Sequence, residues 1–237
     1  MISRSMQFKS IMSFLIAVSA VPVFGQSAPA QPPAAATASP ARPSVDEIAA
    51  KVQANYRQTK TIQAKFVQET RLPGARRPRT AEGMVSFKLP GKMNWDYQRP
   101  SAMQYVSNGQ VFFYYNEEEK YLAVKKLEEA FDSPTPSNFL KGLGELKEAF
   151  NVREPDLGLV DGEGNYRLLL ESKDPKLENF SLTLIIDPVT YKLRGLYQSD
   201  AQGSRTTIRF SDIRENADIP DAIFTVVPAE GTRVQRF

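Results

Sequence analysis

Two of the residue types that often carry enzyme chemistry are absent from this sequence, although carboxylates are plentiful. It contains no cysteine and no histidine, which excludes thiol nucleophiles, disulfide bonds, the commonest general base and zinc sites built from these ligands. There is no Gly-x-Ser-x-Gly elbow and no Ser-x-x-Lys motif, and Gly162 and Gly164 lack the flanking sequence of a phosphate-binding loop. The glutamate runs 117–119 and 128–129 are typical of solvated loops. The sequence therefore predicts no catalytic residue, no cofactor and no metal site.

A cluster of arginines is the clearest candidate for anion recognition. Arg71, Arg76, Arg77 and Arg79 surround Gly74 and two prolines between two expected strands. Guanidinium groups bind carboxylates and phosphates through several donors at once. One interpretation is a solvated hairpin loop. The other is a docking loop for an acidic partner or for anionic lipid headgroups, with Arg76, Arg77 and Arg79 as the contact residues.

Apolar and aromatic side chains form the most regular pattern in the chain. Three segments alternate apolar with polar residues, which is typical of half-buried β-strands. Their apolar members are Ile62, Ala64 and Phe66, then Val85, Phe87 and Leu89, then Met93, Trp95 and Tyr97. Further strands are expected at 111–115, 166–170, 180–186, 193–197, 205–210 and 224–227, which gives about ten in all. Because few connections are long enough for a crossover helix, the sheet should be antiparallel and meander-like.

Two helical segments accompany the expected strands. Ser44 and Glu47 form a capping-box pattern, and helical spacing of apolar residues continues from there to about Thr59. A second, short helix is expected after Pro136. Its apolar residues are Phe139, Leu140, Leu143 and Leu146. We therefore expect an α+β, mainly β fold, in which a curved antiparallel sheet carries both helices on one face.

The N-terminal region has the pattern of an export signal. Residues 1–9 carry two positive charges, and residues 11–24 form an uncharged apolar run. This run is too short for an ordinary membrane span and suits the core of a secretory signal peptide, expected at 1–25. Cleavage after Ala20 or after Gly25 is compatible with the small residues there, and an uncleaved anchor is the alternative.

The composition changes after the signal segment. Residues 26–43 are rich in alanine and proline, which predicts a disordered linker before a folded domain at 44–237. The formal net charge is +3, and the charged residues before position 44 are Arg4, Lys9 and Arg42. The folded part is therefore formally neutral, which argues against a protein that binds nucleic acid.

Five stretches, in order, resemble the outer-membrane lipoprotein carrier family of LolA-like periplasmic lipoprotein chaperones. They are 64–68, 83–95, the turn 107–109 with the aromatic residues and Tyr115-Asn116 that follow it, Thr135-Pro136 with its apolar helix, and 224–234. Pro90, Trp95, Tyr97 and Pro100, at a fixed distance from the Ser-Asn-Gly turn, are the most specific part. The resemblance covers nearly all of residues 44–237. The family's fold is an incomplete antiparallel barrel with helices as a lid over an apolar cavity.

The resemblance implies a carrier and not an enzyme. Such a protein takes triacylated lipoproteins from an inner-membrane lipoprotein-releasing ABC transporter, shields their acyl chains as a monomer in the periplasm, and releases them at the outer membrane. A receptor in the outer membrane is an option left open. At about 0.8 kcal/mol per methylene, three chains of roughly fifteen carbons represent tens of kcal/mol against water. No cofactor is needed, since no bond is made or broken.

The resemblance also implies site residues. The predicted cavity residues are Phe66, Val85, Phe87, Leu89, Met93, Trp95, Tyr97 and Phe113, and ordinary core packing is the other interpretation of each. The predicted lid residues are Phe139, Leu140, Leu143 and Leu146. Many family members carry an arginine before the proline that matches Pro90, where this chain has Leu89. Because leucine lacks the donors that could hold lid carbonyls, we expect the lid to be held by packing alone.

Three other functions stay open. The first is a regulatory module that senses lipid or lipoprotein on the same scaffold, although the chain ends at Phe237, soon after the last expected strand, which favours a plain carrier. The second is a periplasmic hydrolase with an unrecognised site. The third is a shuttle for a glycolipid or polyketide, which differs from the carrier only in cargo because an apolar wall gains free energy from any acyl chain.

Overall fold

Residues 42–127, 145–173, 181–200 and 202–237 are described by the structure, a computed structural model. They belong to one compact unit, Arg42–Phe237. The strands of these described residues are β1 (Thr61–Arg71), β2 (Arg79–Lys88), β3 (Lys92–Arg99), β4 (Met103–Asn108), β5 (Val111–Asn116), β6 (Tyr121–Lys126), β7 (Phe150–Arg153), β8 (Tyr166–Ser172), β9 (Ser181–Ile186), β10 (Leu193–Ser199), β11 (Arg205–Glu215) and β12 (Arg233–Arg236). The helices are α1 (Val45–Arg57), α4 (Leu146–Ala149) and the 3₁₀ helix η3 (Asp221–Phe224).

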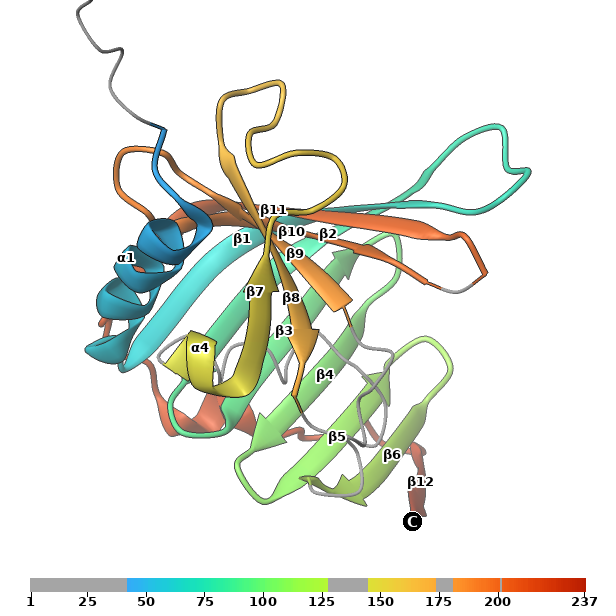
Figure 1. The fold of residues 1–237 in the computed structure, drawn as a ribbon. Helices are drawn as coiled ribbons and strands as arrows, with labels where there is room; N and C mark the ends of the chain where they lie inside the picture. Colours follow the sequence, from blue (N-terminus) through green and yellow to red (C-terminus); the bar gives the residue numbers. More distant parts are fainter. Residues whose placement is uncertain (1–41, 128–144, 174–180, 201) are drawn as a thin grey trace, which may run out of the picture. The chain divides into compact units, whose positions relative to one another are not determined.

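All twelve of these strands form a single open, curved sheet, with β12 and β7 at its edges (Figure 1). Their order across the sheet is β12-β6-β5-β4-β3-β2-β1-β11-β10-β9-β8-β7. The mainly β fold with a curved antiparallel sheet is confirmed. Strand β12 is the exception to the antiparallel arrangement, because it runs parallel to β6. The pairing of β1 with β11 joins two meanders, β1–β6 and β7–β11, into one surface.

The C-terminal part departs from the prediction. Residues 224–227 were expected to form a strand, and this is wrong: Asp221–Phe224 forms η3, and the last strand begins only at Arg233. Phe224 is buried because this segment packs against the sheet instead of joining it. Apolar residues that cover a sheet and apolar residues within a strand give similar short patterns, which explains the error.

Helix α1 begins as the sequence predicts. The backbone N–H of Glu47 donates to the Ser44 hydroxyl at 3.2 Å, and the Ser44 N–H donates to the Glu47 carboxylate at 2.7 Å, so both halves of the capping box are formed. One stripe of the helix packs on the sheet, and Ile48 and Val52 are fully buried there. We call the side of the sheet that α1 covers the inner face, and the opposite side the outer face.

The predicted second helix falls mostly outside the described residues. Phe139, Leu140 and Leu143 all lie there, so their role as a lid stays a prediction. The described part is α4, a single turn whose Leu146 is fully buried in the same core as α1. Among the described residues no helix is long and apolar enough to cross a membrane.

The outer face of β2–β6 is covered by the C-terminal segment. Asn94 Nδ2 donates to the carbonyl of Ile223 at 2.7 Å, and Lys88 Nζ donates to the carbonyl of Ile219 at 3.0 Å. Farther along, Val226 packs on a small outer-face cluster, formed by Tyr115, Leu122 and Val124 with Val111 and Phe113. An apolar ligand that approaches β2–β6 must therefore use the inner face.

The turn between β9 and β10 holds α1 and is itself organised by Asp187. The amides of Thr190 and Val189 donate to Asp187 Oδ1 at 2.7 and 3.0 Å, and the Arg194 guanidinium donates to Oδ2. From the helix, Asn55 Nδ2 donates to the carbonyl of Thr190 at 2.8 Å. The Thr190 amide above all, then Arg194 and the Val189 amide, hold the pKa of the Asp187 carboxyl well below its usual range.

We therefore expect Asp187→Asn to lower the free energy of unfolding more at neutral pH than in acid. A lowered pKa means that ionised Asp187 stabilises the fold above the ordinary aspartate pKa of about 4, and this contribution is lost progressively as the pH falls below it. Urea unfolding at about pH 7 and about pH 3 measures the difference. The exposed Asp218→Asn is the matched control. An equal loss at both pH values would contradict this role of Asp187.

Candidate functional site

Aromatic rings of β1, β2 and β3 meet at the centre of the inner face. The strand register places Phe66 opposite Gly83 and Val85 opposite Trp95. The Trp95 ring lies 5.0 Å from Phe66 and 5.9 Å from Phe87, centroid to centroid, and both contacts are edge-on. Such edge-to-face packing is a favourable geometry for aromatic pairs. Trp95, the only tryptophan, therefore lies in the middle of an apolar, aromatic surface.

The aromatic surface continues across the sheet as a row of tyrosines. Tyr97 lies 5.8 Å from Tyr105, Tyr105 lies 5.1 Å from Tyr114, and Tyr114 lies 6.3 Å from Tyr121. These rings come from β3, β4, β5 and β6, and each is only partly buried. The row thus runs from the buried centre of the inner face towards the β12 edge and changes from apolar to hydroxyl-bearing rings.

Most of the predicted cavity residues lie together on this face. Those that share one buried cluster are Phe66, Val85, Phe87, Met93 and Trp95, with Tyr97 packed against it. Burial in a cluster is also what ordinary core residues show, so their role in binding stays a prediction. Tyr97 donates its hydroxyl to Gln68 Oε1 at 2.8 Å, and burial raises its pKa.

One of the predicted cavity residues lies on the other face. Phe113 is on the outer face, where it packs with Tyr115 and Val226, because Phe112 and Tyr114 take the inward positions of β5. The structure therefore corrects the placement of Phe113. Leu89 follows the end of β2 and is 36% exposed, so its role in a cavity stays a prediction.

A small apolar pocket lies between α1 and the sheet. It is lined by Tyr56, Ile62, Ala64, Val85, Phe87, Leu193, Phe210 and Ile213. Its volume is about 20 Å³, which is room for roughly one water molecule and far less than an acyl chain needs. Burial raises the pKa of Tyr56 to about 12, and its hydroxyl accepts the Leu193 N–H at 3.0 Å. Entry of a long apolar ligand at this pocket therefore requires α1 or the lining side chains to move.

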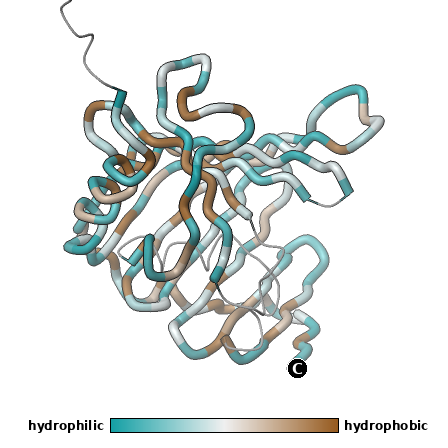
Figure 2. The backbone as a smooth tube through the Cα atoms, viewed as in Figure 1, coloured by the Kyte–Doolittle hydropathy of each residue, from teal (hydrophilic) through white to brown (hydrophobic). Residues whose placement is uncertain are grey.

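The predicted docking arginines lie in an exposed loop. Residues 72–78 connect β1 to β2 in a loop that projects from the sheet, and this loop is mainly hydrophilic (Figures 1 and 2). Arg76 and Arg77 lie within it, Arg79 begins β2, and all three side chains are exposed. They are therefore accessible to a partner, whether it is a protein or a membrane surface.

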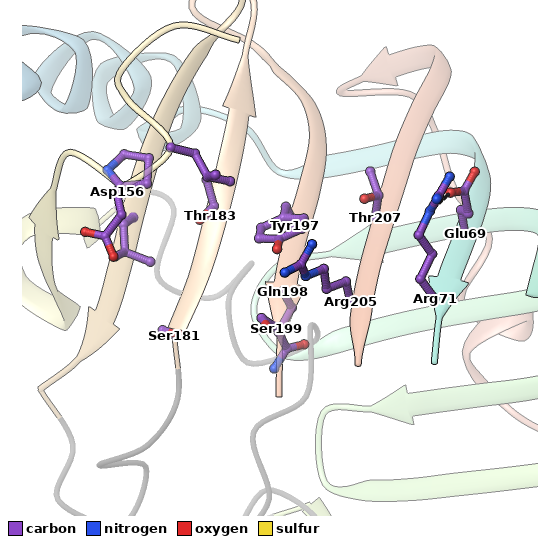
Figure 3. A pocket seen from close by; sticks show the side chains of 13 residues that line it. Glu69, Arg71, Asp156, Ser181, Thr183, Tyr197, Gln198, Ser199, Arg205 and Thr207 are labelled. Atoms are coloured by element: carbon purple, nitrogen blue, oxygen red, sulfur yellow. Dashed lines mark hydrogen bonds and ion pairs between the residues drawn. The ribbon is translucent and has the colours of Figure 1, made fainter. Parts of the chain in front are cut away.

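A second and larger pocket opens on the outer face (Figure 3). It has a volume of about 630 Å³, and its walls are largely polar side chains from five strands. No local sequence pattern indicates this pocket, because its lining residues are far apart in the chain. Across the described residues, no group of three acidic side chains is placed to hold a metal ion.

The described residues thus form an open, curved, mainly β sheet whose inner face is apolar and aromatic and carries α1. The chain belongs to the family described as outer membrane lipoprotein carrier protein LolA, whose model matches residues 57–227.

Individual relatives agree with this family. The outer-membrane lipoprotein carrier protein of Methylococcus capsulatus is 32% identical over 177 residues, which cover 74% of this chain and 81% of that protein. The carrier protein of the same name from Chromohalobacter salexigens is 31% identical over 174 residues, covering 73% and 79% of the two chains. Among solved structures, a LolA superfamily protein from Nitrosomonas europaea has a TM-score of 0.44 at 13% identity and covers 78% of this chain and 99% of its own.

Proposed function

We propose that this protein carries lipoproteins through the periplasm by binding their acyl chains on the inner face of the sheet. The observation that carries the proposal is the aromatic row from Phe66 and Trp95 to Tyr121, in a chain whose relatives are named as lipoprotein carriers. Each methylene removed from water contributes about 0.8 kcal/mol, so such a surface binds an acyl chain without any chemical step. A non-catalytic role follows from this mode of binding.

The remaining steps of transport belong to the same proposal. The signal at 1–25 exports the chain, and the linker at 26–43 precedes the folded domain. Triacylated lipoproteins are taken from an inner-membrane lipoprotein-releasing ABC transporter and delivered to the outer membrane, with or without a receptor there. The open edges of the sheet support the idea of reversible binding, because a closed barrel would have to unpair strands to admit or release three chains.

The loop that carries Arg76, Arg77 and Arg79 is proposed to dock on an anionic partner. Replacing all three by glutamate should slow the loading of lipoprotein from inner-membrane vesicles at low salt and have a smaller effect at high salt, because exposed charges are screened. Glutamate at Arg209, Arg214 and Arg236, which are exposed on β11 and β12, gives a charge reversal of the same size away from the loop. An equal defect in both proteins, or a defect independent of salt, would contradict the docking role.

Native mass spectrometry of the protein purified from periplasm without detergent tests the proposed function. A bound triacylated lipoprotein would support it. Bound phospholipid or glycolipid without lipoprotein would assign the same face to another cargo. An apo mass that takes up no added lipoprotein would count against a carrier and favour a regulatory module, and hydrolysis of added esters would favour a hydrolase.

A further inference from the structure

The larger pocket on the outer face, which we call the outer-face groove, lies away from the proposed acyl site. It crosses β8, β9, β10, β11 and β1, and Figure 3 draws its lining residues. The strand register puts most of them on the opposite side of the sheet from Trp95 and α1. The lining residues are Glu69, Arg71, Pro155, Asp156, Leu157, Leu169, Ser181, Thr183, Tyr197, Gln198, Ser199, Arg205 and Thr207. Its volume, about 630 Å³, is within the usual range of ligand pockets. The C-terminal segment packs on the other half of the outer face, at β2–β6.

The charges at one end of the groove are arranged unfavourably for the protein alone. Arg71 and Arg205 are directly opposite each other in the register of β1 and β11. Like charges at such cross-strand positions destabilise a sheet, and a shared anion would remove this cost. Glu69 lines the same end and bonds Arg71 Nε at 2.8 Å. Because Arg71 is 67% exposed, this ion pair is weak and can be exchanged for another carboxylate.

The floor of the groove is suited to a polypeptide segment. Tyr197 and Thr207 project their hydroxyl-bearing side chains from the adjacent strands β10 and β11, and Thr183 beside them on β9 is only 5% exposed. Hydroxyl groups both donate and accept, so they can bond the alternating N–H and C=O groups of an extended chain. Leu169 adds an apolar surface to the groove. It lies between these hydroxyl groups and Asp156, which lines the far end of the groove. A flat bilayer surface would contact the rim of this groove and not its floor.

We propose that this groove binds an extended, acidic segment of a partner protein, with one carboxylate held between Arg71 and Arg205. The segment crosses the strands over Tyr197 and Thr183 towards Leu169. Since the groove and the aromatic row are on opposite faces, the partner can be bound while acyl chains occupy the inner face. The proposal does not depend on the nature of the cargo.

Fluorescence anisotropy with fluorescein-labelled hexaglutamate tests the charge requirement. The purified protein should bind hexaglutamate and not hexalysine at low salt, and the Arg71→Gln/Arg205→Gln protein should bind it about tenfold more weakly or worse. Arg214→Gln removes the same charge from β11 outside the groove and should leave binding unchanged. Failure of the wild-type protein to bind hexaglutamate, or an equal loss in the Arg214→Gln protein, would overturn the proposal.

Amide chemical shifts locate the bound peptide. On titration with hexaglutamate, the backbone signals of Thr183, Tyr197 and Thr207 should shift, and those of β12 should not. Shifts confined to the loop 72–78 would overturn the proposal in favour of nonspecific attraction to its arginines. Anionic phosphatidylglycerol vesicles that bind the wild-type protein while hexaglutamate does not would overturn it in favour of a membrane contact. Acyl binding should stay unchanged in the double variant, which separates this site from the proposed carrier site.

Discussion

The Tyr105→Glu protein is expected to bind a triacylated lipopeptide at least 100-fold more weakly than the wild type, which corresponds to about 2.7 kcal/mol. Tyr105 is half-buried on the inner face, in ring contact with both Tyr97 and Tyr114. An acyl chain that covers this position would bury the new carboxylate without a partner, and an unpaired buried charge is costly. Because the side chain is partly exposed in the free protein, the substitution should leave the fold intact.

Val67→Glu is the matched control for this experiment. It also introduces a carboxylate into a strand of the sheet, but Val67 points to the outer face, is 50% exposed, and lies opposite Arg209. Its affinity for the lipopeptide should be within about twofold of the wild-type value. Isothermal titration of both proteins, with circular dichroism to confirm folding, gives the comparison. Equal affinities of the Tyr105→Glu and Val67→Glu proteins would show that the inner face is not the acyl site.

Gly83→Ala is expected to lower the free energy of unfolding by at least about 3 kcal/mol. An added Cβ at Gly83 would lie 1.9 Å from the backbone carbonyl oxygen of Asp96 and 3.0 Å from the Cα of Tyr97. Backbone atoms in a paired strand cannot move aside as a flexible side chain can, so β2 and β3 must separate. When these strands separate, their pairing beside Glu82 and the packing of Phe66 on Tyr97 should also be lost.

Gly162→Ala provides the control for Gly83→Ala. No atom lies within 4 Å of the position that its Cβ would take, and its backbone is not in the left-handed region. The stability change should therefore be within about 0.5 kcal/mol. Urea unfolding of the two variants measures both values. A Gly83→Ala protein as stable as the Gly162→Ala protein would contradict the pairing of β2 with β3 that builds the site.

The sequence allows the centre of the inner face to be predicted, because clean alternation identifies one side of each strand. Phe66, Phe87 and Trp95 alternate with polar residues and do lie on one face. Residues 111–115 are all apolar or aromatic, so alternation cannot assign a face, and Phe113 was placed on the wrong side. Strand pairing, which decides such cases, depends on contacts distant in sequence.

The rest of the site could not be predicted from local patterns. Strand β4 buries Val106 on the outer face and carries Tyr105 on the inner face, so it shows no amphipathic alternation, and Tyr105 was missed. The turn signal Asn108-Gly109 could have found it, because a two-residue hairpin there places Tyr105 opposite Phe112, on the same face as Tyr114. The structure turns one residue later, so that Tyr105 lies opposite Tyr114. The outer-face groove depends on five strands and a loop, so only the folded chain brings Arg71 beside Arg205.

Quenching of Trp95 by a lipopeptide with dibrominated acyl chains tests the central proposal most directly. Trp95 is the only tryptophan and lies in the middle of the aromatic surface, so the emission of the protein reports contact at one position. Bromine quenches tryptophan only at short range. We expect the brominated lipopeptide to quench most of the emission and the unbrominated one to bind equally well without quenching. Tight binding of the brominated lipopeptide with undiminished Trp95 emission would contradict acyl binding on the inner face.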